Sequence, residues 1–451
     1  MELLRETSQR AIRYLEHLNQ RGVAPTRENV AGLERLGMEL PDNPTDPMDV
    51  IRELDEVVSP ATMAMAGPRF FGFVIGGSLP ATLAANWLAG AWDQNTAFYD
   101  ITPGTARLEE IALTWLIDLF KLPQQSGGAF VTSDTLANFS ALAAARHEVL
   151  RQLGWNVESD GLIGAPKLQL VVGAEAHPSL FKSLGLLGLG RNKVTRVPVD
   201  DQGRMRADAL PALSRSTIIC TQAGNVNTGS FDPIEEICGP AHEAGAWVHV
   251  DGAFGLWASA APSKAYLTEG VEEADSWATD AHKWLNVPYD SGLAFVRNGD
   301  ALRSAMAISA EYLPASKAHR DPSEYTPELS RRARGVEVWA ALRSLGRSGL
   351  ADLIERTCRY AKRFAEGLTE AGYEVLNDVV LNQVLVSFGD AHTTRKIIAE
   401  LQADGTCWCG VTVWQGHTAM RISVSSWATR DEDVERSLKE MLRIAAKYGK
   451  R

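Results

Sequence analysis

A lysine, Lys283, lies between a histidine and a tryptophan in the stretch TDAHKWLNVPYDSG, residues 279–292. Lysine normally lies on a solvated surface, yet many of its neighbours here are aromatic, apolar or small. Two interpretations are open. Lys283 is either a surface lysine beside an apolar turn, or an amine that binds a carbonyl cofactor covalently, as a lysine amine in a partly apolar setting can.

Three further reactive side chains follow β-rich apolar runs. His177 comes after LQLVVG, Thr228 comes after TIICTQ, and Asp251 ends the run AWVHVD. Because ligands of open α/β sheets bind at the carboxyl ends of the strands, we expect these side chains and Lys283 to meet at one edge. Taken singly, each also has an ordinary explanation as a capping, turn or hydrogen-bonded residue.

A carbonyl cofactor such as pyridoxal phosphate (PLP) would use three of these groups. It needs an amine for a Schiff base, a carboxylate that keeps the pyridine nitrogen protonated, and a flat group against the ring face. Lys283, Asp251 and His177 are the candidates for these three tasks.

The cofactor also needs a phosphate site, which the N-terminus of a helix can provide. The segment VTSDTLANFSALAAAR offers one, with Ser133 and Thr135 where a strand-like run meets a helix. Capping of the helix by Ser133 or Asp134 explains the same residues, and both interpretations can hold together.

These segments carry a family resemblance. HVDGAFGLWA, TDAHKWLN, EAHPSLFKSLGLLGLG and TSDTLANFSALAAAR resemble the group II PLP-dependent amino-acid decarboxylases, over about residues 66–445. The segment that begins RFFGFVIGG at residue 69 is similar to the substrate-side region of that family. The resemblance implies the aspartate aminotransferase fold of type I, PLP as the cofactor, and a homodimer with its active site at the interface.

The resemblance also implies roles for individual residues. Lys283 forms the Schiff base, Asp251 pairs with the pyridine nitrogen, and Ala253 and His177 pack against the ring. The implied cofactor-binding residues are Ser133, Asp134, Thr135, His177, Thr228, Asp251, Ala253, Asp280, His282 and Lys283. The implied catalytic residues are Lys283, His177, Asp251 and Tyr325, the substrate-binding candidates are Arg421, Phe71 and Tyr99, and no metal ligand is implied.

Two positions depart from the family pattern. Ser133 and Asp134 stand where relatives usually have glycines, and we expect Asp134 to point away from the phosphate and to cap the helix. Pro322 falls close to the place of the tyrosine that donates a proton after carbon dioxide leaves. Tyr325, Tyr312 and His319 are the candidates to replace it, and Tyr325 is the one we name.

The resemblance favours decarboxylation through a Schiff base and a quinonoid intermediate. If Arg421 holds the substrate's α-carboxylate, aldol-type cleavage or another reaction at a Cα bond becomes the alternative; a surface ion pair explains Arg421 equally well. Phe71 and Tyr99 either line an aromatic-tolerant pocket or belong to the core. Two remote alternatives are a metal hydrolase built on His249, Asp251, His177 and His282, and a non-catalytic binding protein.

The elements that position these residues alternate between helix and strand. Helical patterns at 105–122, 134–153 and 232–245 alternate with β-rich runs at 167–173, 216–223, 246–253 and 292–297. This order predicts an α/β fold with a mainly parallel, seven-stranded-type sheet between helices. We expect an N-terminal helical arm at 1–65, a large PLP-binding domain at 66–310, and a mobile loop with a smaller α+β domain at 311–451.

Composition limits the partners. The chain has 451 residues, 45% of them hydrophobic, and a net charge of −11, which disfavours nucleic acid because that partner needs a basic face. The basic run SRRARG at 330–335 is interpreted as a helix start or a phosphate-facing patch. Five cysteines in a long chain predict no disulfide framework. No apolar run approaches a membrane span, so we expect a cytoplasmic enzyme with a small-molecule amino-acid substrate.

Overall fold

The computed structural model describes residues 1–308 and 319–449. The chain forms two compact units. The large unit comprises Ser78–Arg359 and Asn377–Gln383; the small unit comprises Met1–Gly77, Tyr360–Leu376 and Val384–Arg451. The large unit therefore starts later than residue 66 and includes the described residues 319–359, which the sequence pattern had assigned to the smaller domain.

The N-terminal segment belongs to the small unit rather than standing apart as an arm. The backbone N–H of Val23 donates to the carbonyl of Gly405 at 2.8 Å. Arg69, which is almost fully buried, donates to the carboxylate of Asp433 at 3.0 Å and to the carbonyl of Thr406 at 2.8 Å. These bonds join the first and last parts of the chain within one unit.

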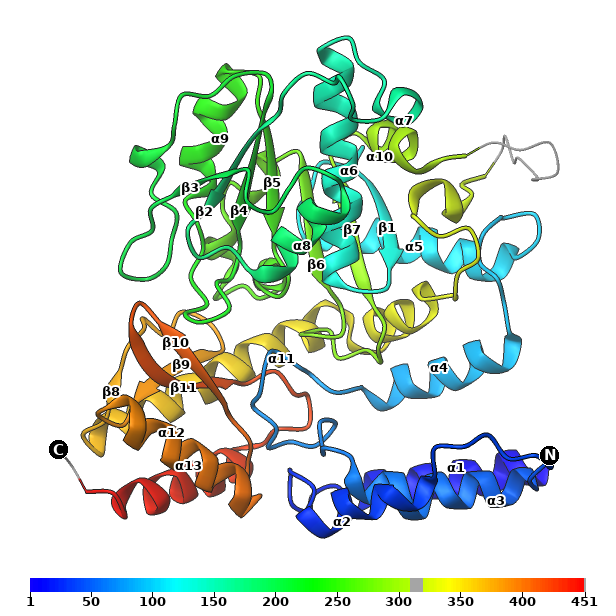
Figure 1. Cartoon of the computed structure of the whole chain (residues 1–451), viewed down its shortest axis with the longest axis vertical. Coiled ribbons are helices and arrows are strands. Elements are labelled where there is room, and N and C mark those ends of the chain that lie inside the picture. Colours follow the sequence, from blue (N-terminus) through cyan, green and yellow to red (C-terminus); the bar gives the residue numbers. More distant parts are fainter. Residues whose placement is uncertain (309–318, 450–451) are drawn as a thin grey trace. The chain divides into compact units, whose positions relative to one another are not determined.

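The large unit contains a seven-stranded sheet, as predicted (Figure 1). Its strands are β1 Gly127–Val131, β2 Gln169–Gly173, β3 Val194–Val197, β4 Thr217–Gln222, β5 Trp247–Asp251, β6 Ser276–Asp280 and β7 Gly292–Val296, in the order β1-β7-β6-β5-β4-β2-β3. The five strands from β3 to β6 pair in parallel, and β7 is antiparallel to both of its neighbours. The carboxyl ends of the parallel strands therefore share one edge.

Helix α6 packs on one face of the sheet. It packs against β5, β6 and β7, while α8 and α10 pack against α6. The helices of the large unit are α4 Pro80–Trp92, α5 Pro103–Leu119, α6 Asp134–Gln152, α7 Val157–Asp160, α8 Pro178–Leu186, α9 Ile234–Glu243, α10 Gly299–Met306 and the first part of α11 Gly335–Glu370. Five buried alanines on α6 leave room for close packing: Ala137, Ala141, Ala143, Ala144 and Ala145.

Helix α11 runs through the boundary between the two units. Gly346 lies inside it with φ 60° and ψ −175°, so its backbone is not helical there. This break divides α11 into two helical stretches. A glycine suits the position because other residues rarely adopt a positive φ.

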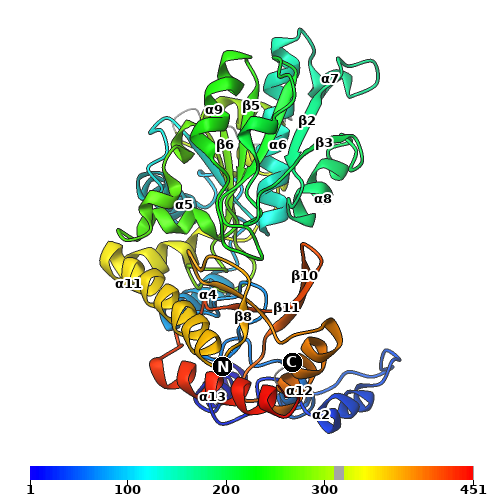
Figure 2. The same cartoon turned by 90° about the vertical axis from the view of Figure 1, so that its left-hand side faces the viewer.

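The small unit combines helices with a four-stranded sheet of order β10-β11-β9-β8. Its elements are α1 Glu2–Glu16, α2 Arg27–Ala31, α3 Pro47–Glu53, β8 Glu374–Val375, β9 Gln383–Ser387, α12 Ala391–Asp404, β10 Gly410–Trp414, β11 His417–Ser423 and α13 Asp431–Ala446. Helix α12 packs on β10 and β11, and α13 lies beside α12 (Figures 1 and 2).

Short helical turns complete the chain. These are η1 Gly32–Leu36, the π-helical η2 Leu54–Val58, η3 Ser59–Ala61, η4 Ala207–Ala209, η5 Gly255–Ala260, η6 Ala265–Thr268, η7 Val271–Glu273 and η8 Pro322–Tyr325. Among the helices of the described residues, none is both long and apolar enough to cross a membrane.

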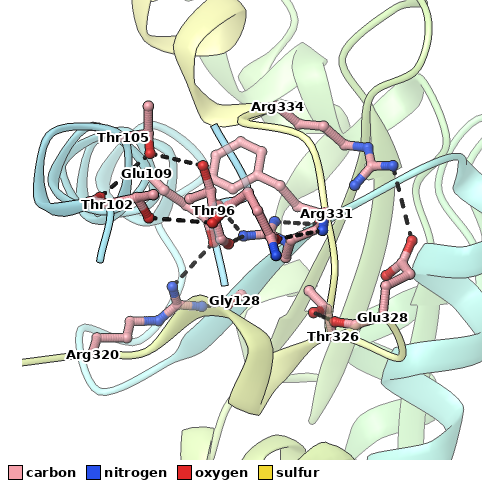
Figure 3. A network of polar contacts seen from close by, with 12 residues as sticks. Thr96, Thr102, Thr105, Glu109, Gly128, Arg320, Thr326, Glu328, Arg331 and Arg334 are labelled. Carbon is pink, nitrogen blue, oxygen red and sulfur yellow. Dashed lines mark hydrogen bonds and ion pairs between the residues drawn. The ribbon is translucent and has the colours of Figure 1, made fainter. Parts of the chain in front are cut away.

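Two arginines cover the open edge of β1. Arg331 donates to the carbonyl of Phe130 at 2.8 Å, and Arg320 donates to the carbonyl of Gly128 at 2.6 Å. Both guanidinium groups also bind the buried carboxylate of Glu109, at 2.6 Å from Arg331 and 3.1 Å from Arg320 (Figure 3). Such covering satisfies edge groups that would otherwise pair with another strand. The run SRRARG thus leads into α11, and Arg331 faces Glu109 rather than a phosphate site.

Candidate active site

The carboxyl ends of the parallel strands bring the predicted residues together. Asp251 is the last residue of β5 and pairs with Gln222 of β4 and Ala278 of β6. Strand β6 ends at Asp280, and the turn that follows carries Lys283. In the large unit, the topology therefore delivers a carboxylate and an amine to the same edge.

Asp251 is buried and held by donors. The backbone N–H of Ala253 donates to its carboxylate at 3.3 Å, and the amide of Asn138 also hydrogen-bonds to it. Burial raises the pKa of Asp251, while the charge of Lys283 and these two hydrogen bonds oppose the shift. Asp251 is thus a carboxylate that favours a positively charged partner.

Lys283 lies among three buried carboxyl groups. It is half-buried, and in the described part of the chain no hydrogen bond or ion pair involves its amine. Its charge opposes the rise in the pKa of Asp134, Asp251 and Asp280. The lysine of the opening motif therefore does not belong to an ordinary surface.

Asp134 does not cap α6, contrary to the prediction. Ser133 is the N-cap residue, since its hydroxyl accepts the N–H of Leu136 at 3.4 Å. The Asp134 carboxylate instead accepts from the amide of Asn138 at 3.2 Å and interacts with Asp251, Lys283 and His177. Burial and the Asp251 charge raise the pKa of Asp134 to about 7. Because Ser133 already caps the helix, the Asp134 side chain can lie toward the strand ends instead.

Asp280 and His282 lie at the same edge. The Asp280 carboxylate accepts the N–H of His282 at 2.8 Å and the N–H of Asp134, and burial raises the pKa of Asp280 to about 7. Nδ1 of His282 bonds to the carbonyl of Val287 at 2.7 Å. Nε2 of His282 is buried without a hydrogen-bond partner among the described residues. An unpartnered buried nitrogen is unusual and calls for an explanation, such as a ligand.

His177 begins α8. Its Nδ1 lies 2.7 Å from the hydroxyl of Ser179, and the N–H of Ser179 donates to Nδ1 at 3.3 Å. The ring of His177 is thereby oriented by its own helix, four residues after β2 ends. Its interaction with the Asp134 carboxylate links it to the same cluster.

The N-terminus of α6 approaches the sheet closely. A Cβ built on Gly292 would lie 2.3 Å from the backbone of Ser133, so only glycine fits at the start of β7. This close approach brings the first turn of α6, with Ser133 and Thr135, to the strand-end edge. A 19-residue helix directs its free N–H groups and positive dipole end there.

A match to a family model identifies the protein family of this chain. The model described as the pyridoxal-dependent decarboxylase conserved domain matches residues 31–389. The chain belongs to the pyridoxal-dependent decarboxylase family.

Individual relatives agree with the family. The aromatic-L-amino-acid decarboxylase of Bacillus atrophaeus is 23% identical over 457 residues, covering 96% of this chain and 92% of the relative. That of Sus scrofa is 30% identical over 396 residues, covering 82% and 80%. The crystal structure of Oryza sativa TDC with PLP and tryptamine matches with a TM-score of 0.90 at 22% identity, covering 99% of this chain and 97% of that one. The predicted family, fold and PLP cofactor are confirmed, and the chain is a PLP-dependent lyase.

The residues at the strand ends fit PLP. A buried carboxylate at Asp251 suits a protonated ring nitrogen, and Lys283 is an amine without an ion-pair partner in the described chain. The unpartnered Nε2 of His282 and the N-terminus of α6 suit the polar and anionic parts of the cofactor. The roles of these individual residues in binding PLP remain predictions.

Thr228 and Ala253 lie on turns beyond their strands. The buried hydroxyl of Thr228 bonds to the carbonyl of Gln202 at 2.8 Å and to the hydroxyl of Ser230 at 2.7 Å. Thr228 therefore already stabilises its own loop, and its contact with the cofactor stays a prediction. Ala253 follows Asp251 by two residues and donates its N–H to that carboxylate.

Tyr325 is not brought to the strand ends within this chain. Its ring lies 4.2 Å from the guanidinium of Arg320 and lines a cavity of about 820 Å³ that also includes Gly127. Gly127 begins β1, and β1 and β6 both run antiparallel to β7. The cavity therefore lies one strand length, roughly 13 Å, from the edge that holds Asp280 and Lys283. Pro322, near which the resemblance placed the proton-donating tyrosine, is buried, and Tyr312 lies outside the described residues.

The remaining substrate candidates are spread over both units. In the large unit, the ring of Tyr99 stacks on His319 at 3.8 Å. In the small unit, Phe71 is buried in the core, where its ring meets Phe364 at 5.2 Å. Arg421 lies on β11 of the small unit, and burial lowers its pKa to about 10. Their roles in substrate binding stay predictions.

Two members of the site, Asn138 and Ser179, were not predicted from the sequence. The signal for Asn138 was its position four residues after Asp134 on one helix face.

The sequence had suggested His249 only as a metal ligand. Both ring nitrogens of His249 are instead hydrogen-bonded within the protein, Nδ1 with Ser276 at 2.9 Å and Nε2 with Asn138 at 2.8 Å. Within residues 1–308 and 319–449, no three His, Cys, Asp or Glu side chains are grouped to hold a metal.

Proposed function

We propose that this decarboxylase removes the α-carboxyl group of an L-amino acid with an aromatic side chain, using PLP bound at Lys283. The observation that carries the proposal is the shared environment of Lys283 and Asp251 at the carboxyl ends of β5 and β6. The names of the Bacillus atrophaeus and Sus scrofa relatives support the aromatic substrate class.

In this proposal Lys283 is the residue whose amine would hold the cofactor covalently. Asp251 holds a proton at the ring nitrogen, and the donors Ala253 and Asn138 keep its carboxylate oriented. When bound, PLP supplies a ring that accepts the electron pair of the bond broken at Cα. His177, the N-cap residue of α8, would lie against the cofactor ring.

The phosphate group is proposed to bind at the N-terminus of α6, near Ser133 and Thr135. Nε2 of His282 is available there for a hydrogen bond. Asp134 and Asp280, whose pKa burial raises to about 7, reduce their repulsion of a phosphate by holding protons. Uncharged carboxyl groups can also donate hydrogen bonds to phosphate oxygens.

A second candidate reaction is aldol-type cleavage at Cα, and Arg421 favours it. Burial alone lowers the pKa of Arg421, and within the described residues no acidic side chain pairs with its guanidinium. A half-buried guanidinium without such a partner is suited to a carboxylate ligand. If that ligand is the substrate's α-carboxylate, the bond to it is protected and another Cα bond breaks.

The predicted homodimer and cytoplasmic location also remain proposals. Apolar side chains on α4 support a second copy of the chain as partner, because Trp87, Leu88 and Trp92 are each more than 40% exposed. Exposed apolar residues that cluster on one helix are typical of protein interfaces.

The attachment of the cofactor tests the proposal. The chain is incubated with PLP, reduced with borohydride and digested, and the peptides are weighed by mass spectrometry. We expect the reduced cofactor on the peptide that contains Lys283, no such peptide from Lys283→Ala, and full labelling of a variant of the exposed Lys182, Lys182→Ala. Cofactor attached to another lysine would contradict the proposal.

A further inference from the structure

A short hydrogen-bond chain connects Asp134 to His177. The hydroxyl of Ser179 lies 2.7 Å from Nδ1 of His177 and 3.5 Å from Oδ2 of Asp134. The N–H of Ser179 also donates to Nδ1 at 3.3 Å, which suits a ring that carries no proton at Nδ1. The Ser179 hydroxyl can therefore accept from a protonated Asp134 while it donates to the ring.

A second chain of hydrogen bonds, through Asn138, reaches the same Oδ2 atom of Asp134. The indole N–H of Trp247 can only donate, so the Ser276 hydroxyl accepts it at 2.9 Å and gives its own proton to Nδ1 of His249 at 2.9 Å. Nε2 of His249 must then donate to Oδ1 of Asn138 at 2.8 Å. Burial lowers the pKa of His249 to about 3, so this ring is neutral.

The orientation of Asn138 follows from that direction. Because its Oδ1 accepts from His249, its amide NH2 must point the other way, and it donates to Oδ2 of Asp134 at 3.2 Å. The carboxyl group of Asp134 is therefore held in place from α6, while Ser179 on α8 remains its exchangeable contact.

We propose that Asp134 shares one proton with His177 through the Ser179 hydroxyl, and so sets the protonation state of the His177 ring. In the step, a proton leaves Oδ2 of Asp134 for Oγ of Ser179, while the hydroxyl proton of Ser179 passes to Nδ1 of His177. The result is a carboxylate and an imidazolium, with Ser179 unchanged and the total charge the same.

The charged and titratable groups around Asp134 allow both states. Burial and the Asp251 charge on β5 raise the pKa of Asp134 to about 7, and Lys283, His177 and Ser179 oppose that rise. Asp280, at the end of β6, accepts the backbone N–H of Asp134. A proton can therefore leave and return to Asp134 near neutral pH.

The consequence for catalysis rests on the proposed function, because only there does His177 touch the cofactor. In that setting Asp134 is a positioning residue that acts through His177 and supplies its proton.

The test measures the ring of His177 directly and needs no turnover. The full-length chain is labelled with 15N-histidine, the signals of His177 are assigned by their loss in His177→Gln, and the ring nitrogen shifts are followed across pH. We expect a step near pH 7 in the wild type that is lost in Asp134→Asn and in Ser179→Ala. Ser179→Thr, which keeps the hydroxyl, restores it.

Asp275→Asn is the matched control. Asp275 is also a carboxyl group whose pKa burial raises, but its hydrogen bonds go to the N–H of Val248 and to His242. Its replacement should leave the His177 step unchanged. A step that persists in both Asp134→Asn and Ser179→Ala overturns the inference, whether or not the chain proves to be a decarboxylase of aromatic amino acids.

Discussion

Arg331 and Glu109 lie 2.6 Å apart, and neither side chain is exposed to solvent. Arg320 binds the second oxygen of the same carboxylate. The pair joins α5 to the segment that leads into α11, and through Arg331 it also closes the edge of β1. Breaking such a buried pair leaves a charge without compensation.

Glu109→Ala should therefore destabilise the chain strongly. We expect the free energy of unfolding to fall by about 3–5 kcal/mol, since two arginines lose their shared carboxylate. Unfolding in urea measures the change. The exposed pair of Arg347 and Asp118 is the control, because Arg347→Ala should cost at most about 1 kcal/mol. Equal losses in the two variants would contradict the role given to Glu109.

Asp251→Asn should keep the fold and lose most of the activity. Asparagine preserves the shape of the side chain but not the charge that holds a proton at the cofactor nitrogen. We expect kcat to fall on the order of 10²–10³-fold, the size typical for loss of one preorganised electrostatic contact. Steady-state kinetics measures it, with Asp275→Asn, which changes a partly buried carboxylate, as a control that should retain wild-type kcat. Unchanged turnover in Asp251→Asn would remove Asp251 from the mechanism.

Asp134 should make the stability of the cofactor-free chain depend on pH. Burial raises its pKa from 3.8 to about 7, so between these values the folded chain binds the proton more tightly than the unfolded chain. The contribution of Asp134 to the free energy of unfolding therefore falls as pH rises from about 4 to about 7. Asparagine does not titrate, so Asp134→Asn should gain stability relative to the wild type between about pH 5 and about pH 8.

Urea unfolding at both pH values measures this difference. Glu148→Gln is the control, because the hydrogen bond from Arg151 holds the pKa of Glu148 below its ordinary value of 4.5. The stabilisation by Glu148 is lost only as pH falls below that value, so its variant should differ from the wild type by a constant amount over the same range. If the stability difference between Asp134→Asn and the wild type is also constant over this pH range, the pKa of Asp134 is not raised by burial.

The exposed face of α4 should govern dimerisation. Leu88 and Trp92 are 54% and 45% exposed, and charge at these positions would oppose burial against a second copy. We expect Leu88→Glu with Trp92→Glu to shift the chain toward monomer in analytical ultracentrifugation. Ile163→Glu changes a fully exposed residue outside this helix and should leave the sedimentation unchanged. A dimer of undiminished stability in the double variant would place the interface elsewhere.

Much of the large unit could be predicted from periodicity. The apolar runs that became β2, β4, β5 and β7 are buried along their length, and such strands have a distinct pattern. Strands β3 and β10 were not predicted from the sequence because both are half-exposed and mixed in polarity. The grouping of the N-terminal segment with the C-terminal part depends on pairs such as Arg69 and Asp433, which no local pattern reveals.

The candidate site divides in the same way. The sequence could place Asp251 and Lys283 at one edge of the sheet, because the carboxyl ends of parallel strands share an edge regardless of how the side chains are oriented. Asp134 was assigned the wrong task, since serine and aspartate are equally good N-caps and only the three-dimensional structure shows that Ser133 takes that place. Tyr325 was chosen by its distance along the chain, and sheet register places it away from Lys283.

The central claim is that this PLP-dependent lyase decarboxylates amino acids through Lys283. Mass spectrometry of the products from a panel of aromatic, acidic and β-hydroxy amino acids, with PLP present, tests it most directly. The account predicts an amine lighter than its substrate by carbon dioxide, formed by the wild type and not by Lys283→Ala, with aromatic substrates preferred. An aldehyde with glycine, or a keto acid, formed without any amine would contradict it.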